Sequence, residues 1–115
     1  MKNEKIETLR IADEYLDNLK IGITNIVNLI QEGNEIVGMK KIIPVFDGMG
    51  YISNAVTLTK DIQKEKIELE DLNNQLNEMI EAFENEDYIL LGDLLNYELL
   101  PVIEEMKNKV SLSIS

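Results

Sequence analysis

The residues most able to do chemistry in this sequence are carboxylates. Twelve acidic residues lie between Lys66 and Lys107, with no lysine or arginine among them. A hard cation such as Ca²⁺ needs oxygen ligands at alternating positions around a glycine turn, and Asn85-Glu86-Asp87 is too short to supply them. The pattern therefore indicates a solvated acidic face, with a docking surface for a basic partner as the alternative.

Acid–base catalysis would need two carboxylates that face one another. Asp93 and Glu98 are five residues apart, so on a helix their side chains point about 140° apart. Glu104 and Glu105 are adjacent and diverge in a similar way. We assign no catalytic residue to this sequence and expect that the protein is not an enzyme.

Histidine and cysteine are both absent from the sequence. This composition excludes catalysis by Ser-His-Asp or Cys-His groups, the usual zinc sites and the Glu-x-x-His motif of di-iron helix bundles. Haem would lack its usual axial ligand. We therefore expect no cofactor and no metal ion.

Gly48-Met49-Gly50 resembles half of a dinucleotide-binding fingerprint. Ser53 stands where the third glycine would be, and no convincing strand precedes the motif. We interpret the two glycines as marks of close helix packing or of local loosening of a helix.

The spacing of apolar residues predicts four helices that would position these groups. Gly33 supplies the left-handed conformation that commonly ends a helix, and similar apolar spacing predicts further helices over 35–57, 69–84 and 87–109. The first helix, over 4–32, carries a heptad seam with steps of three and four residues. The seam consists of Leu9, Ala12, Leu16, Leu19, Ile23, Ile26 and Ile30.

We predict an all-α fold, an antiparallel up-down-up-down four-helix bundle whose second and fourth helices are kinked by prolines. Pro44 and Pro101 each lie inside a helical pattern, where proline removes an amide donor and pushes against the preceding turn. Residues 1–109 form a single domain, and residues 110–115 a frayed C-terminal tail. A rival interpretation makes Ile42–Phe46 a strand, but Pro44 and the lack of a partner strand count against it.

Charge and composition exclude several kinds of partner. The formal net charge is −11, and such a field repels nucleic acid and anionic lipid. No apolar run approaches the roughly 18 residues that span a membrane, and no apolar segment follows polar residues 1–5 as in a signal peptide. We expect no nucleic-acid ligand, no membrane association and a cytoplasmic location.

The C-terminal part of the chain resembles a group of known proteins. The resemblance rests on Asp87-Tyr88, on Leu90-Leu91-Gly92-Asp93-Leu94-Leu95 and on Tyr97-Glu98-Leu99-Leu100-Pro101. This segment is similar to the C-terminal part of small, uncharacterised all-helical proteins of Gram-positive bacteria. The resemblance implies a bacterial helical domain and no known activity.

We predict a non-enzymatic protein-interaction module: an adaptor, a chaperone-like protein or a small subunit. It would act through an apolar helix face or groove and an acidic surface, on a protein partner of basic charge. Helices of uneven length would leave part of the first seam uncovered, so we also expect a symmetric homodimer.

The alternative is a small-molecule-binding sensor or a minimal enzyme, with a pocket between helices near Pro44. Aromatic and methionine side chains of the second and fourth helices would line this groove. The candidate groove residues are Phe46, Met49, Tyr51 and Tyr97.

Overall fold

The computed structural model describes residues 2–115, so the predicted start of the domain at residue 1 lies outside it. The fold is all-α: 86% of the chain is helical, and no strand occurs among the described residues. The rival strand over 42–46 is therefore wrong. The elements are α1 (Lys2–Gln31), α2 (Glu35–Lys40), α3 (Ile42–Leu58), the 3₁₀ turn η1 (Lys60–Ile62), α4 (Glu70–Glu84), α5 (Tyr88–Asp93), the π-helix η2 (Leu94–Leu99) and α6 (Leu100–Ile114).

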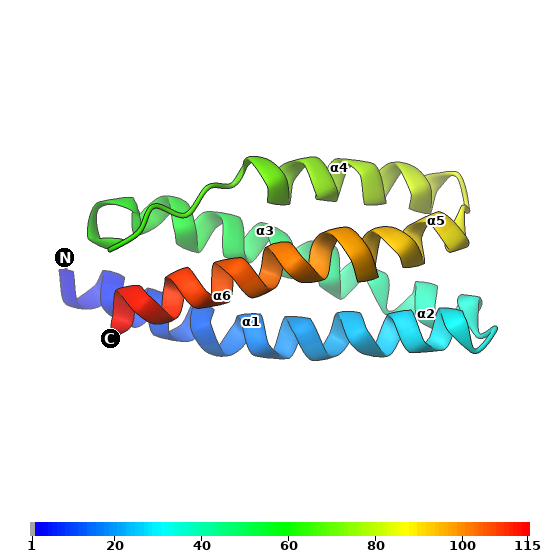
Figure 1. Ribbon diagram of the computed structural model, residues 1–115, viewed down its shortest axis with the longest axis horizontal. Helices are drawn as coiled ribbons and strands as arrows, with labels where there is room; N and C mark the ends of the chain where they lie inside the picture. Colours follow the sequence, from blue (N-terminus) through cyan, green and yellow to red (C-terminus); the bar gives the residue numbers. More distant parts are fainter. Residues whose placement is uncertain (1) are drawn as a thin grey trace.

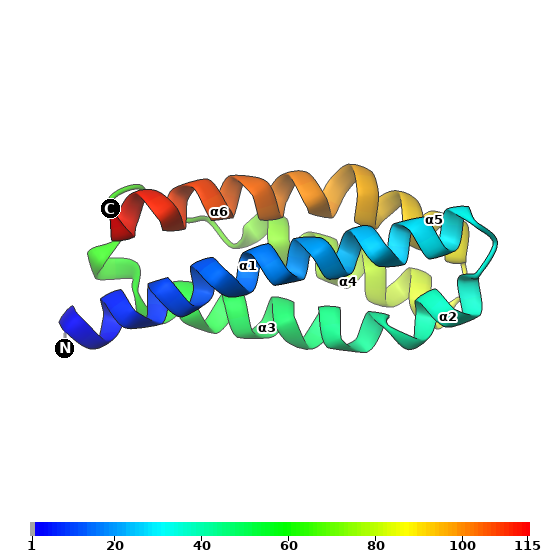
Figure 2. The ribbon, with the colours of Figure 1, turned by 90° about the horizontal axis from the view of Figure 1, so that it is seen from below.

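The helices lie side by side along the long axis of a molecule that measures 46 × 21 × 19 Å (Figures 1 and 2). α5, η2 and α6 follow one another without a break and form one long helical segment. Both termini lie at one end, which we call the terminal end, whereas α2 and α5 lie at the other, which we call the distal end (Figure 1). Among residues 2–115, no helix is both long and apolar enough to cross a bilayer.

The heptad seam of α1 lies inside the molecule. Every seam residue from Leu9 to Ile26 is buried, and Ile30 is partly buried against the same core. α6 and α3 provide most of the cover. The seam therefore leaves no apolar stripe free for a second copy of the chain, and the predicted homodimer loses the feature on which it was based.

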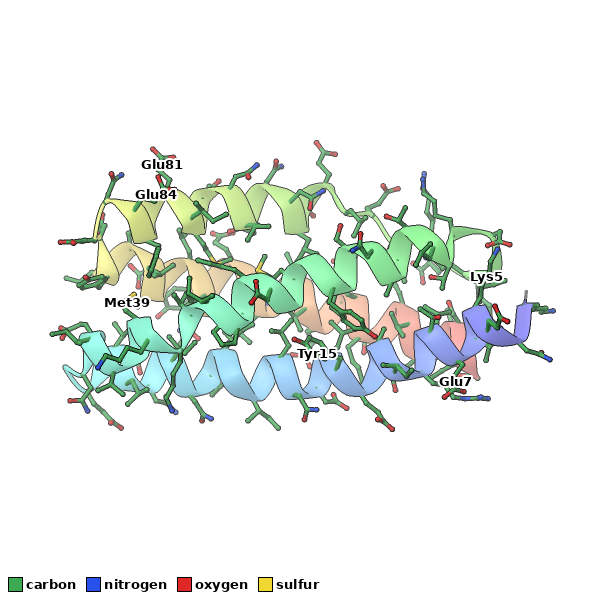
Figure 3. The ribbon with its side chains drawn as sticks, turned by 180° about the vertical axis from the view of Figure 1, so that it is seen from behind. Lys5, Glu7, Tyr15, Met39, Glu81 and Glu84 are labelled. Atoms are coloured by element: carbon green, nitrogen blue, oxygen red, sulfur yellow. The ribbon has the colours of Figure 1, made fainter. Side chains whose placement is uncertain are left out.

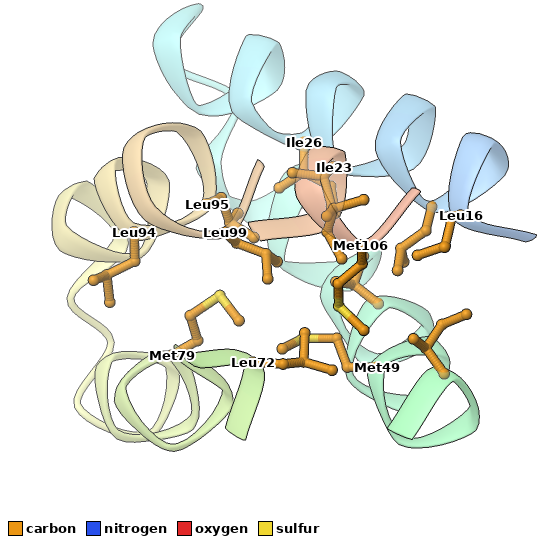
Figure 4. Close-up of a cluster of buried hydrophobic side chains, with 14 of the residues drawn as sticks. Leu16, Ile23, Ile26, Met49, Leu72, Met79, Leu94, Leu95, Leu99 and Met106 are labelled. Carbon is orange, nitrogen blue, oxygen red and sulfur yellow. The ribbon is translucent and has the colours of Figure 1, made fainter. Parts of the chain in front are cut away.

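The core is built from all the long helical elements. Figure 4 shows side chains from α1, α3, α4, η2 and α6 that converge on one interior, among them Leu16, Met49, Met79 and Leu95. Each of these four is at most 1% exposed. Truncating such a side chain to alanine typically costs about 2–5 kcal/mol, so this interior is the main source of stability.

The second predicted helix is divided into α2 and α3 at Lys41. The Lys41 N–H bonds to the carbonyl of Gly38, three residues back, and α3 starts at the next residue. Pro44 is therefore the third residue of a new helix, where a missing amide donor costs little because the first turn has no partners to bond. The structure thus places a helix boundary three residues before the proline.

Pro101 is the second residue after the π-helical segment η2, which ends at Leu99. The Leu100 N–H donates to the carbonyl of Leu95, five residues back, instead of four as in an α-helix. Such a wide turn takes up one extra residue and relieves the crowding that a proline causes in the turn before it.

The C-terminal residues differ from the predicted frayed tail. α6 continues to Ile114, Val110 is fully buried, and Ser113 is 3% exposed. The Ser113 Oγ accepts a hydrogen bond of 3.1 Å from the Lys64 amide. These contacts hold the last turn against the core and the segment after η1.

Lys107 ties α6 to α1. Its Nζ lies 2.9 Å from Asp13 Oδ1 and 2.8 Å from Asp17 Oδ2, and Ser111 donates to Asp13 Oδ1 at 2.7 Å. Burial lowers the pKa of Lys107, but hydrogen bonds to Asp17 and Asp13 outweigh it and raise the pKa overall. The ammonium group is therefore charged at neutral pH and fixes the two helices against one another.

Lys107→Met should lower the free energy of unfolding by about 1 kcal/mol more than Lys20→Met. Lys20 also pairs α1 with α6, through Glu104 at 2.8 Å, but Lys20 and Glu104 are more exposed than Lys107 and Asp13, and exposed pairs contribute little. Urea denaturation of the two variants measures the difference. Because the folded state raises the pKa of Lys107, the contribution is complete below about pH 10.4 and is lost as the pH rises through the folded-state pKa. Equal losses in the two variants would contradict the prediction.

Pro44→Ala should lower the free energy of unfolding by about 0.4–1 kcal/mol or leave it unchanged. The proline occupies a first helical turn that suits it, so its main effect is to restrict the unfolded chain. Thermal unfolding followed by circular dichroism tests this. A clear rise in melting temperature would contradict it and would indicate that the new amide bonds to the Lys40 carbonyl and joins α2 to α3.

Candidate functional site

The four residues predicted to line a groove do not come together. Phe46 packs edge-on against Phe83 of α4, with ring centroids 5.9 Å apart. Met49 is buried in the core, as Figure 4 shows. Tyr51 stacks at an angle on Tyr15 of α1, with centroids 5.0 Å apart, and Tyr97, in η2, is 68% exposed. They face α4, the interior, α1 and solvent respectively, so they share no groove.

A hollow does lie near Pro44, but other residues line it. It has a volume of about 300 Å³ and opens between α1 and α3. Tyr15 and Gly22 line it on the α1 side, and Pro44 and Val45 on the α3 side.

Gly48 is a point of close contact between helices. A Cβ atom added there would lie 2.6 Å from the Tyr15 Oη and 3.2 Å from Leu19 Cδ1. The same addition at Gly50 would meet nothing within 4 Å. The first glycine of Gly48-Met49-Gly50 therefore allows α1 and α3 to approach, as the packing interpretation of the motif requires.

The two side chains whose pKa is clearly shifted hold helices together. Hydrogen bonds from Lys5 at 2.8 and 2.9 Å lower the pKa of Asp61, and Lys107 is held between α6 and α1. Both groups are occupied by ion pairs. No group of three or more acidic side chains in residues 2–115 lies close enough to bind a metal ion.

The distal end combines exposed apolar side chains with acidic ones. Ile36 on α2 is 70% exposed and Ile89 on α5 is 76% exposed, and Val37 and Leu90 beside them are also open to solvent. Acidic residues follow along α4, and Figure 3 shows Glu81 and Glu84 on its outer side. This end is therefore a part of the surface where exposed apolar side chains lie near negative charge.

A second hollow, here called the α4–α5 hollow, lies within this region. It has a volume of about 210 Å³. Asp87 fixes one edge, because its Oδ1 accepts a hydrogen bond of 3.2 Å from the Leu90 amide and so caps α5. The hollow has three apolar members, Ala82, Leu90 and Leu94, and four polar ones, Glu78, Glu81, Asn85 and Asp87.

Sequence reasoning missed the residues of the distal end. One signal was present: Ile89, Leu90 and Leu94 are additional to the single apolar stripe that the fourth helix needs to face a core. Of the three, Ile89 and Leu90 are exposed. Apolar residues in excess of one stripe could thus have indicated a second contact surface.

The molecule belongs to the class of acidic, all-α domains with an exposed apolar end. Residues 7–109 match the family described as Domain of unknown function (DUF8042). Because the match covers most of the chain, the protein belongs to this family. No curated protein and no solved structure gives a significant match. Membership agrees with the resemblance to uncharacterised proteins, and it assigns no activity.

The pair Gly48→Ala and Gly50→Ala tests the close contact between α1 and α3. Gly50→Ala should raise stability by about 0.5–1 kcal/mol, because alanine favours a helix interior and the site is open. Gly48→Ala should instead lower stability, because the new Cβ atom forces the Tyr15 ring to move and so disturbs its packing on Tyr51. Comparison of the urea midpoints measures both effects, and similar gains for both variants would show that the contact is loose.

Proposed function

We propose that this protein is a non-enzymatic protein-interaction module, an adaptor, a chaperone-like protein or a small subunit, that binds its partner at the distal end. In this proposal the helices form an antiparallel up-down-up-down four-helix bundle, bent at Pro44 and Pro101, which serves as a rigid support. The side-by-side helices and the placement of both termini at one end support this arrangement (Figure 2).

The exposed apolar side chains of the distal end carry the proposal. Ile36 and Ile89 keep most of their surface in water although the seam of α1 and the rest of the core are covered. Large apolar side chains that remain exposed at one end of a folded protein make that end a candidate interface. The core therefore accounts for stability without these residues, and a partner accounts for them.

The charge of the surface supports a partner of basic character. α4 carries five acidic and no basic residues, and Glu86 and Asp87 follow it. Such a surface attracts basic proteins from a distance and repels nucleic acid.

The cellular setting in this proposal is the bacterial cytoplasm. The resemblance of residues 87–101 to proteins of Gram-positive bacteria supports a bacterial source. The lack of cysteine fits a reducing compartment, in which disulfides are rare.

The second candidate is a small-molecule-binding sensor or a minimal enzyme, which the hollow beside Pro44 favours. Its volume of about 300 Å³ is at the lower limit for a ligand pocket. Binding of a metabolite there would cover the Tyr15 side chain and change its near-ultraviolet circular dichroism signal. The docking proposal requires no such change.

Capture of a partner from extract of the source cells tests the interaction module. The immobilised full chain should retain a protein that the double variant Ile36→Asn, Ile89→Asn loses. Ile21→Asn is the matched control, because Ile21 on α1 is 60% exposed but lies outside the distal end. Retention of the same proteins by all three chains, or of none by the unchanged chain, would contradict the proposal.

A further inference from the structure

We infer that the α4–α5 hollow is a docking site for a basic amphipathic helix. One large apolar side chain of the partner enters the hollow, and lysine or arginine side chains beside it meet Glu78, Glu81 and Asp87. This inference rests on the proposed function, because the hollow belongs to the same distal end, and it specifies the chemistry of the partner.

The size and lining of the hollow suit a single side chain. Its volume of about 210 Å³ is below the roughly 300–1,000 Å³ of small-molecule pockets. Ala82 and Leu94 are buried beneath it, and Leu90 is 45% exposed. An apolar side chain of a partner would thus find apolar neighbours below and at one side, while the surrounding carboxylates stay in water.

The charges around the hollow indicate that the partner carries positive charge where it docks. Glu78 and Glu81 are three residues apart on α4, so they lie on one side of the helix about one turn apart. Within residues 2–115, no carboxylate from Glu70 to Glu98 forms an ion pair with a lysine or arginine. These acids repel one another, and cations spaced by one helical turn on a partner would relieve that repulsion.

The walls of the hollow favour a helical partner. They come from two neighbouring helical segments, α4 and α5–η2, whose backbone donors and acceptors are mostly used inside the helices. No strand occurs in residues 2–115, so this part of the chain has no sheet edge to which an extended peptide could add. A partner therefore binds through side chains, as an amphipathic helix does when its apolar face enters a groove between helices.

A synthetic helical peptide provides the test. The probe has about 14 residues, with leucine every three or four positions and lysine elsewhere, and fluorescence anisotropy with the full chain measures its dissociation constant. We expect Leu90→Asn to raise this constant by about tenfold, because one apolar contact is lost. The double variant Glu78→Gln, Glu81→Gln should raise it by about fivefold and reduce its salt dependence.

Matched controls separate the site from general attraction between opposite charges. Glu4→Gln, Glu14→Gln removes the same number of charges from exposed carboxylates of α1 that lie outside the distal end, and it should change binding by about twofold at most. A peptide with glutamate in place of lysine, and one of the same composition in scrambled order, should bind far more weakly. Circular dichroism verifies that each variant is folded, and Glu78 and Glu81 are exposed, so the double variant does not disturb the core.

Several results would overturn the inference. These are no binding of the leucine–lysine peptide, equal weakening by the Glu4/Glu14 and Glu78/Glu81 variants, or equal binding of the scrambled peptide. A chain that sediments as a dimer, and that Leu90→Asn converts to a monomer, would assign the hollow to a second copy instead. If extract capture still depends on Ile36 and Ile89 while the peptide fails, only this inference falls and the interaction module stands.

Discussion

Close packing of α1 against α3 and α6 determines where every other element can lie. The seam of α1 is buried from Leu9 to Ile26, and three contacts set the distances between α1 and its neighbours: Gly48 against Tyr15, Gly92 against Ile30, and Lys107 against Asp13. At Gly92 an added Cβ would lie 3.2 Å from Ile30 Cγ2. Because α1 is held along its length, the other helices must fit around it. Only the residues that do not pack in this arrangement remain exposed for other contacts.

Those remaining residues lie apart from the ones that stabilise the fold. The interior holds one apolar stripe from each long element, whereas Ile36, Ile89 and Leu90 lie outside it. The ion pairs between elements follow the same division: they join α1 to η1 and to α6, and none of the ion pairs of residues 2–115 uses a carboxylate of α4. Substitutions on a surface that contributes little to folding change stability little, so this surface can vary in sequence without loss of the fold.

Most of the fold could be predicted from the sequence, because apolar spacing records which face of each helix meets the core. The seam of α1 and the end of that helix at Gly33, where φ is 85°, follow from local patterns. The residues of the predicted groove do not come together, because Phe46, Met49 and Tyr51 share one helix yet each faces a different neighbour. Apolar periodicity predicts that a residue faces inward, but it does not predict which helix it will contact. The α4–α5 hollow could not be predicted for the same reason, because it forms only where two helices pack together.

The π-helical turn η2 changes which residues of α6 face the interior. Regular α-helical spacing from Leu91 and Leu95 would bring Val102 to the interior, whereas the structure buries Ile103, with Val102 only partly buried. The wide turn thus acts like a one-residue shift of register, since each residue of an α-helix turns the face by about 100°. A relative that lacks one residue between the positions of Leu94 and Leu99 would therefore have a regular α-helix in place of this turn. Its core residues after the gap would keep the same positions in the structure, although each would stand one residue earlier in its sequence.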